Sequence, residues 1–159
     1  MNNLNILLAD DDLDDCHFFK DALTSLALNS HLITVHNGEE LMSHLFTDNV
    51  TLPHVLFLDL NMPRKNGFEC LAEIKSDADL KLLPVIVFST SFDQERVKLL
   101  YNSGAKYFMR KPAAFSQLKA VIHDALQHIA RDMDIENSAA RMHTSESNFV
   151  ITGGQNLVL

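Results

Sequence analysis

The chain has few of the features that mark secreted, membrane or nucleic-acid-binding proteins. Its 159 residues include two cysteines, Cys16 and Cys70, which stand far apart and in no metal-ligand spacing. Two isolated thiols are typical of a reduced protein and give no basis for a disulfide framework. No apolar run approaches the roughly 20 residues that cross a bilayer, and the N-terminus lacks the basic start of a signal peptide. We therefore expect a cytoplasmic protein.

Positive charge is also scarce. The 13 Lys and Arg residues face 21 Asp and Glu residues, which gives a net charge of −8. An acidic surface repels nucleic acid and anionic membranes, so we expect neither as a partner. Apolar residues make up 47% of the chain, and a folded domain of this size buries roughly 70% of its unfolded surface. Stability therefore requires neither a metal nor a disulfide.

Short apolar runs alternate with longer amphipathic segments along the chain. We predict strands at residues 6–9, 32–35, 55–58, 85–88 and 107–109. Most of these runs are continuously apolar, as expected for strands that are buried on both faces of a parallel sheet. Between them, apolar residues spaced by three and four predict helices, and Ser91 with Gln94 predicts a capping box. Five such β–α units predict an α/β fold with a doubly wound sheet.

The pattern changes near residue 132. A polar segment covers residues 136–148, and two short apolar islands follow at 149–151 and 157–159. Two interpretations remain open: a mobile tail, or islands that dock on the domain or on a second copy. We therefore divide the chain into a domain over residues 1–131 and a C-terminal extension over 132–159, partly disordered or docked. The extension is too short to be a DNA-binding or catalytic output domain.

Polar residues follow four of the predicted strands. Asp10 and Asp11 follow the first strand, Asp59 the third, Ser89 the fourth and Lys111 the fifth. Because the carboxyl ends of parallel strands meet at one edge of the sheet, we expect these side chains to converge. Two carboxylates about 5 Å apart repel each other by roughly 3 kcal/mol at an effective dielectric constant of about 20. Such a pocket favours Mg²⁺, which uses one or two carboxylates together with waters and phosphate oxygens.

This set of side chains predicts phosphoryl transfer to a carboxylate. We assign Asp10 and Asp11 to the metal and Asp59 to the nucleophile, with Lys111 and Ser89 stabilising the charge on the phosphoryl oxygens. The neighbouring acids Asp12, Asp14 and Asp15 are assigned mainly to the start of a helix. A calcium loop is rejected because it needs glycine at its sixth position, where Asp15 stands. The eight histidines form no ligand pair, and we expect them to be exposed or partly buried.

Four segments resemble the receiver domain of bacterial two-component response regulators. They are "ILLADDD", "VLFLDLNMPRKNG", "LPVIVFSTS" and "GAKYFMRKP", in the order and spacing of that family, and the resemblance covers roughly residues 4–130. It implies a flavodoxin-like five-stranded parallel sheet of order 2-1-3-4-5 with five helices. The stretches "LNMPRKNG" and "STS" look like the stand-alone receivers that are often paired with phytochrome-type kinases.

The resemblance also implies roles at the metal site. Asp59 would accept the phosphoryl group. Asp11 and Asp59 would bind Mg²⁺ directly, Asp10 through a water, and Asn61 through its backbone carbonyl. Thr90 stands where many receivers carry alanine, so its bulk is expected to alter access to the phosphoryl group.

Three further roles concern the response to phosphorylation. Ser89 matches the switch hydroxyl and Lys111 the phosphate-binding lysine, and the bond from Lys111 to Pro112 is expected to be cis. Phe108 matches the aromatic switch position, but it lacks the hydroxyl of the commoner tyrosine, so it must act through packing.

The predicted function is a phosphorylation-activated switch in a two-component phosphorelay. A histidine kinase or a histidine phosphotransfer protein would supply the phosphoryl group, and partners would bind the surface of the fourth helix, fifth strand and fifth helix. The protein would be a phospho-acceptor regulator rather than an enzyme, limited to its own phosphorylation and dephosphorylation. An apolar face near Tyr101 and Phe108 makes a homodimer a further candidate.

Two alternatives share a doubly wound sheet. A haloacid-dehalogenase-like phosphatase needs a second acid two residues after the nucleophile, where this chain has Asn61, an amide that does not exchange protons usefully. A flavodoxin-like binding module needs a glycine- or hydroxyl-rich phosphate loop after the first strand, where three aspartates would repel a phosphate. Turnover of phosphate esters would support the first alternative, and a yellow purified protein the second.

Overall fold

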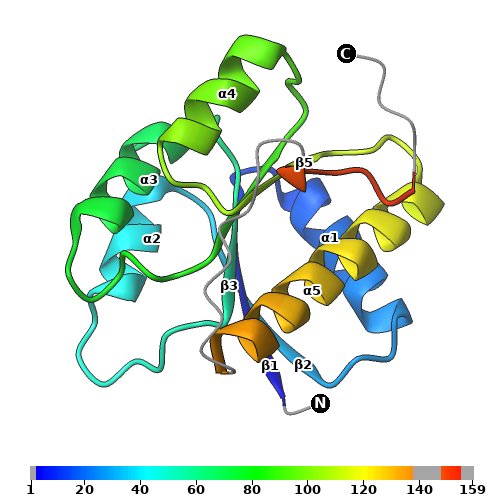
Figure 1. The fold of residues 1–159 in the computed structure, drawn as a ribbon, viewed down its shortest axis with the longest axis horizontal. Coiled ribbons are helices and arrows are strands. Elements are labelled where there is room, and N and C mark those ends of the chain that lie inside the picture. The colour runs from blue at the N-terminus through cyan, green and yellow to red at the C-terminus, as the bar shows by residue number, and fades with distance from the viewer. Residues whose placement is uncertain (1–2, 138–147, 155–159) are drawn as a thin grey trace.

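The computed structural model describes residues 3–137 and 148–154, which form one sheet with helices on both faces (Figure 1). The strands are β1 (Leu4–Ala9), β2 (Ser30–Val35), β3 (Val55–Leu58), β4 (Val85–Ser89), β5 (Tyr107–Arg110) and β6 (Val150–Ile151). The helices are α1 (Leu13–Ser25), α2 (Gly38–Leu45), α3 (Gly67–Ser76), α4 (Gln94–Asn102) and α5 (Phe115–Asn137). None of the helices in the described part of the chain is both long and apolar enough to span a membrane.

All neighbouring strands are parallel, in the order β2-β1-β3-β4-β5-β6. This confirms the doubly wound α/β fold and the predicted order of the first five strands. The sheet has six strands rather than the predicted five, because β6 is added beside β5.

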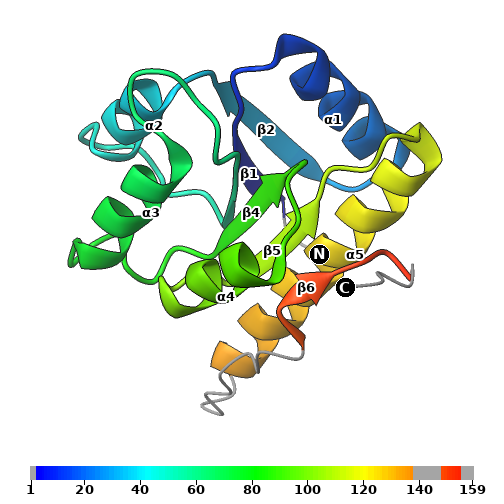
Figure 2. The same cartoon turned by 90° about the horizontal axis from the view of Figure 1, so that it is seen from above.

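The two faces of the sheet carry separate apolar cores. Helices α1 and α5 cover one face, and α2, α3 and α4 cover the other (Figure 2). Side chains alternate between the cores along each central strand: on β3, Leu56 packs in the α2–α3–α4 core and Phe57 packs against Phe19 of α1. Every residue of β3 and β4 is buried. The central strands are continuously apolar because both of their faces are covered.

Acidic and amide side chains set the starts of the helices. At α1, the Asp12 carboxylate accepts the backbone N–H groups of Asp14 and Asp15, at 2.9 and 3.2 Å. At α4, Asp93 accepts the N–H of Arg96 at 2.8 Å. The predicted capping box of Ser91 with Gln94 is therefore wrong, because Asp93 lies next to the first helical turn and occupies the cap itself.

The first apolar island of the C-terminal extension docks on the domain. Strand β6 pairs with β5, and the Phe108 N–H donates to the Phe149 carbonyl at 3.0 Å. Phe149 is fully buried, with its ring centroid 5.3 Å from that of Tyr101, and Ile151 enters the opposite core. The division at residue 131 stays a prediction, since α5 continues across it. The second island, at 157–159, lies outside the described residues.

Replacing Phe149 with alanine should test the docking of β6. Loss of a fully buried aromatic side chain is expected to lower the free energy of unfolding by about 3 kcal/mol. Asn148 is exposed, so Asn148→Ala serves as the matched control and should stay within about 0.5 kcal/mol of wild type. Urea unfolding measures both. Hydrogen exchange at the Phe108 amide should also accelerate in Phe149→Ala, and equal stability of the two variants would contradict the docked strand.

Candidate functional site

Hydrogen bonds that continue past the strand ends bring the predicted site residues to one edge of the sheet. The N–H of Asp10 donates to the carbonyl of Val35 at 3.0 Å, and the N–H of Asp59 donates to that of Ala9 at 2.9 Å. The N–H of Lys111 likewise donates to the Ser89 carbonyl at 2.9 Å. Asp10, Asp59 and Lys111 are thus each the first residue beyond their strands, and their backbones are held by the neighbouring strands. Ser89 is the last residue of β4, and Asp11 follows Asp10.

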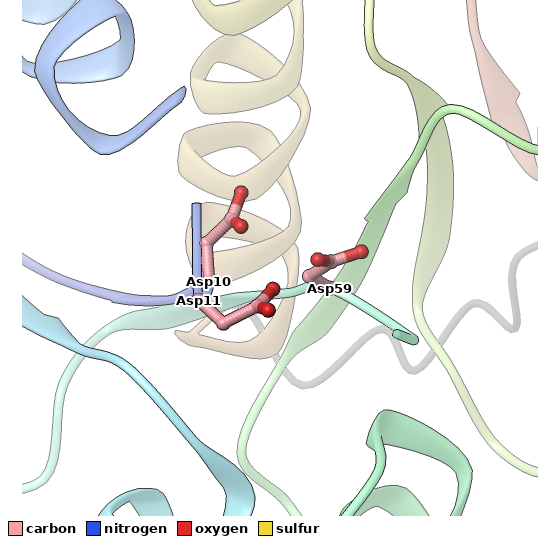
Figure 3. Close-up of side chains that lie close together, drawn as sticks. All are labelled: Asp10, Asp11 and Asp59. Atoms are coloured by element: carbon pink, nitrogen blue, oxygen red, sulfur yellow. The ribbon is translucent and has the colours of Figure 1, made fainter. Parts of the chain in front are cut away.

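Three carboxylates gather at this edge. Oxygens of Asp10, Asp11 and Asp59 all lie within 4.8 Å of one another, at the ends of β1 and β3 (Figure 3). Asp10 is fully buried and Asp59 is 6% exposed, whereas Asp11 is exposed. The cluster therefore has two enclosed carboxylates and one that faces solvent.

The Lys111 ammonium group balances part of this charge. The Nζ of Lys111 lies 2.6 Å from Asp10 Oδ2, 3.0 Å from Asp15 Oδ2 and 3.5 Å from Asp59 Oδ2. It also sits 5.2 Å from the centroid of the Phe88 ring, within the range of a cation–π contact. The contact with Asp15 was not predicted, because an acid in the first turn of a helix is accounted for by the helix dipole alone.

Burial and the surplus of acids shift the acid–base equilibria of the site. Burial raises the pKa of Asp59 to about 6, with the Lys111 charge acting against that rise and the Asp10 charge adding to it. Burial also raises the pKa of Asp10, although its hydrogen bond to Lys111 opposes the shift. Burial alone would lower the pKa of Lys111, but the hydrogen bond and the charge of Asp10 raise it overall. The lysine is therefore always charged at neutral pH. The carboxylates of Asp10, Asp15 and Asp59 all lie within 3.5 Å of its ammonium group.

Gly67 allows α3 to begin directly against the end of β3. A Cβ atom at this position would lie 2.3 Å from the backbone oxygen of Asp59, and the Gly67 N–H donates to the Leu60 carbonyl at 2.9 Å. Any larger residue would push the loop away and move Asp59 with it. No local pattern in the sequence predicts this role of Gly67, although its place directly after the helix cap Asn66 indicates a tight approach.

The remaining predicted residues surround the carboxylates without joining the cluster. Ser89 is buried, and its hydroxyl oxygen accepts the N–H of Ser91 at 3.2 Å. Phe108 is fully buried, with its ring centroid 5.5 Å from that of Phe92. Asn61 and Thr90 are exposed, and the backbone N–H of Asn61 hydrogen-bonds to the Asp59 carboxylate. Ser89 and Phe108 thus lie on the neighbouring strands β4 and β5, and their switch roles stay predictions.

Two further expectations can be compared with the structure. The Lys111–Pro112 bond is not cis, since the described residues contain no cis peptide bond. That prediction was wrong, and the trans form follows the usual preference of roughly 0.5–1 kcal/mol for X–Pro bonds. The histidines in the described part of the chain are exposed or half-buried, as expected, and His143 lies outside the described residues.

The donor set fits a small divalent cation. Carboxylate oxygens are the hard ligands that such ions take, and three of them lie close enough to share one ion. Lys111 alone cannot neutralise three acids, so a dication would relieve their repulsion. The exposed Asp11 leaves the cluster open on one side, where further ligands can complete the coordination.

Comparison with known proteins agrees with this geometry. Residues 6–123 match the family model of the response regulator receiver domain. The response regulator Rcp1 from Synechocystis sp. is 34% identical over 110 residues, which cover 67% of this chain and 75% of that protein. A crystal structure of the phosphorylated cyanobacterial phytochrome response regulator RcpA matches with a TM-score of 0.68 and 32% identity, over 89% of this chain and 99% of that one. The Mn²⁺-bound form of Rcp1 matches with a TM-score of 0.67 and 28% identity, over 89% and 97% of the chains.

Asp59→Asn should stabilise the protein at neutral pH in the presence of a chelator. The pKa of Asp59 is raised to about 6 in the folded protein, so folding favours the protonated carboxyl group. Its contribution to the free energy of unfolding of wild type is therefore highest in acid and falls as the pH rises through that value, whereas the amide of the variant has no proton to lose. We expect the free energy of unfolding of the variant to exceed that of wild type by about 1–3 kcal/mol at about pH 7.5 and to match it below about pH 4. Urea unfolding across this range measures the difference. Asp21→Asn, at an exposed site on α1, is the control, and a gain that did not depend on pH would contradict the account.

Proposed function

The chain belongs to the response regulator receiver domains of two-component signalling, and on this premise we propose that it is a switch that takes a phosphoryl group on Asp59. One observation carries the proposal: Asp59 lies 3.5 Å from the Lys111 ammonium and shares a three-carboxylate cluster. The donor would be a sensor histidine kinase or a histidine phosphotransfer protein. The protein would then act as a phospho-acceptor rather than as an enzyme on an outside substrate.

In the proposed transfer, a carboxylate oxygen of Asp59 forms a bond to the phosphorus of a phosphohistidine. The bond from phosphorus to the imidazole nitrogen breaks, and its electron pair stays with the imidazole, which then takes up a proton. Asp59 must be ionised to attack. Its pKa of about 6 leaves it mostly ionised at neutral pH, while its burial limits competition from water.

Mg²⁺ is the metal that we propose for the site. Asp11 and Asp59 would bind it directly, Asp10 through a water, and Asn61 through its backbone carbonyl. When bound, the ion would neutralise the carboxylates and stabilise negative charge on the phosphoryl oxygens. The close carboxylate oxygens support this assignment, as does the Mn²⁺-bound form of the related Rcp1.

Lys111 and Ser89 would bind the phosphoryl oxygens. The lysine is already within reach of Asp59. The Ser89 hydroxyl oxygen accepts the Ser91 N–H, and this contact does not use the hydroxyl hydrogen, which can serve a new acceptor. Turning Ser89 toward Asp59 would move a fully buried residue of β4, which pairs with β5. Phe108 would follow by repacking against Phe92. The surface of α4, β5 and α5 would then change, and with it the docked strand β6.

The assembly and location of the protein are further parts of the proposal. We keep a homodimer as a candidate. Phe149 covers the face near Tyr101 and Phe108, so a second copy would meet α4 at exposed Leu99, or would displace β6. Light scattering with and without a phosphoryl mimic distinguishes these states from a monomer. The buried free thiols of Cys16 and Cys70 support a reducing, cytoplasmic location.

Acetyl phosphate with Mg²⁺ should add one phosphoryl group to the protein, seen by intact mass spectrometry. Asp59→Asn removes the nucleophile and should abolish the added mass, whereas Asp14→Asn, an exposed change in the first turn of α1, should preserve it. Lys111→Met should slow the reaction by on the order of a hundredfold, because it deletes a charged group beside the transferring phosphoryl group. A wild-type protein that stays unmodified at saturating donor would refute the proposal.

Mg²⁺ alone should stabilise the folded protein. At ten times its dissociation constant, an ion that binds only the folded state adds about 1.4 kcal/mol to the free energy of unfolding. Thermal unfolding followed by circular dichroism measures this gain. Asp11→Asn should lose most of it because it removes a direct ligand, and Asp14→Asn should keep it. If Asp11→Asn gained as much as wild type, the metal would be bound elsewhere.

A further inference from the structure

The first turn of α1 contributes an additional carboxylate to the site. Asp12 caps the helix and orients its first turn, and Asp15 then reaches Lys111 Nζ at 3.0 Å. The side chain of Asp15 is 34% exposed and that of Lys111 only 10%. Asp14 belongs to the same turn but is exposed and lies outside this set of contacts.

The three carboxylates around the lysine are not equivalent. Asp10 and Asp15 hydrogen-bond to the ammonium, whereas Asp59, the proposed phosphoryl acceptor, is the most distant of the three at 3.5 Å. Two of the three hydrogens that an ammonium group can donate thus go to Asp10 and Asp15. These two bonds draw the lysine toward β1 and α1, and away from a phosphoryl group on Asp59.

Without Asp15, the lysine would still be held inside the site. Asp10 lies 2.6 Å from its Nζ, and the Phe88 ring lies at 5.2 Å. A cavity of about 110 Å³ opens beside Asp15, but Phe18, Phe88 and Phe115 are among its walls. An apolar cavity offers an ammonium no replacement for a carboxylate. The lysine would therefore shift toward Asp59.

We propose that Asp15 is a positioning residue that holds Lys111 back from Asp59 and so limits the rate of phosphorylation. This inference rests on the proposed function, because it assumes that Asp59 receives the phosphoryl group. In the transfer, Asp59 bonds to phosphorus as the donor's leaving group departs with its electron pair, and Lys111 must turn to the new phosphoryl oxygens. This movement of Lys111 breaks its hydrogen bond to Asp15, so phosphorylation is slower than it would be without Asp15.

The test compares two variants that remove the same charge from the same helical turn. The initial rate of phosphorylation by acetyl phosphate with Mg²⁺ is measured by intact mass for wild type, Asp15→Asn and Asp14→Asn. Both substitutions reduce repulsion of the anionic donor, but only Asp15→Asn also weakens the hold on Lys111, because an amide oxygen carries no charge to attract the ammonium. We expect Asp15→Asn to react faster than Asp14→Asn, by on the order of threefold to tenfold, as for loss of a partly exposed charged hydrogen bond. Asp15→Glu restores the carboxylate and should return toward the wild-type rate.

A second readout follows the lysine itself, with neither donor nor metal present. The Lys111 side-chain NMR resonances, assigned with Lys111→Met, should move in Asp15→Asn and stay in place in Asp14→Asn. A wild-type protein that takes up no phosphoryl group would refute the proposed function instead. If wild type is phosphorylated, an Asp15→Asn rate equal to or below that of Asp14→Asn overturns the inference, as do unmoved Lys111 resonances.

Discussion

The surplus of negative charge around the Lys111 ammonium is the constraint on which the rest of the site depends. One cation faces the carboxylates of Asp10, Asp15 and Asp59 within 3.5 Å, and Asp11 adds a fourth acid at the solvent side of the cluster. Such a group of like charges is stable only while other charges or protons compensate it. The pKa of Asp59 is raised mainly by burial, and the charge of Asp10 adds to that rise. The same surplus of negative charge favours binding of a dication, and it makes the repulsion among the carboxylates depend on the position of the lysine.

The parallel sheet makes this arrangement sustainable. Both faces of β3 and β4 are covered, so the acidic residues emerge at the end of a rigid, apolar layer. Backbone hydrogen bonds extend across the strand ends and hold Asp10, Asp59 and Lys111 in place. Gly67 lets α3 start against Asp59 without a clash. The stability of the two cores thus offsets the repulsion at the edge. In the proposed switch, small changes at this edge would select between packed states of β4 and β5.

Much of the fold and most of the site could be predicted from the sequence, because both depend on local patterns. Continuous apolar runs indicate buried parallel strands, and the residue after each run falls at a shared edge. The pattern therefore predicts that Asp10, Asp11, Asp59 and Lys111 lie together. The helix cap at Asp93 was not predicted, because Ser91 and Asp93 are both residue types that cap helices and lie close together in the sequence. Only the path of the backbone decides which of them caps α4.

Features that depend on distant contacts were not predictable in the same way. Strand β6 has two residues, too few to show a hydrophobic period. It forms because it pairs with the edge of β5 and because Phe149 packs against the ring of Tyr101. Asp15 looks like an ordinary helix-start acid, and its partner Lys111 lies 96 residues away along the chain. Neither fact is encoded in a local pattern. Both required the assembled sheet.

A crystal structure with Mg²⁺ and beryllofluoride, a mimic of the phosphoryl group, tests the central claim most directly. We predict the beryllium on a carboxylate oxygen of Asp59, the metal on Asp11 and Asp59, and Lys111 Nζ moved from Asp15 onto a fluorine. A metal bound away from these carboxylates, or beryllofluoride on any other residue, would contradict it.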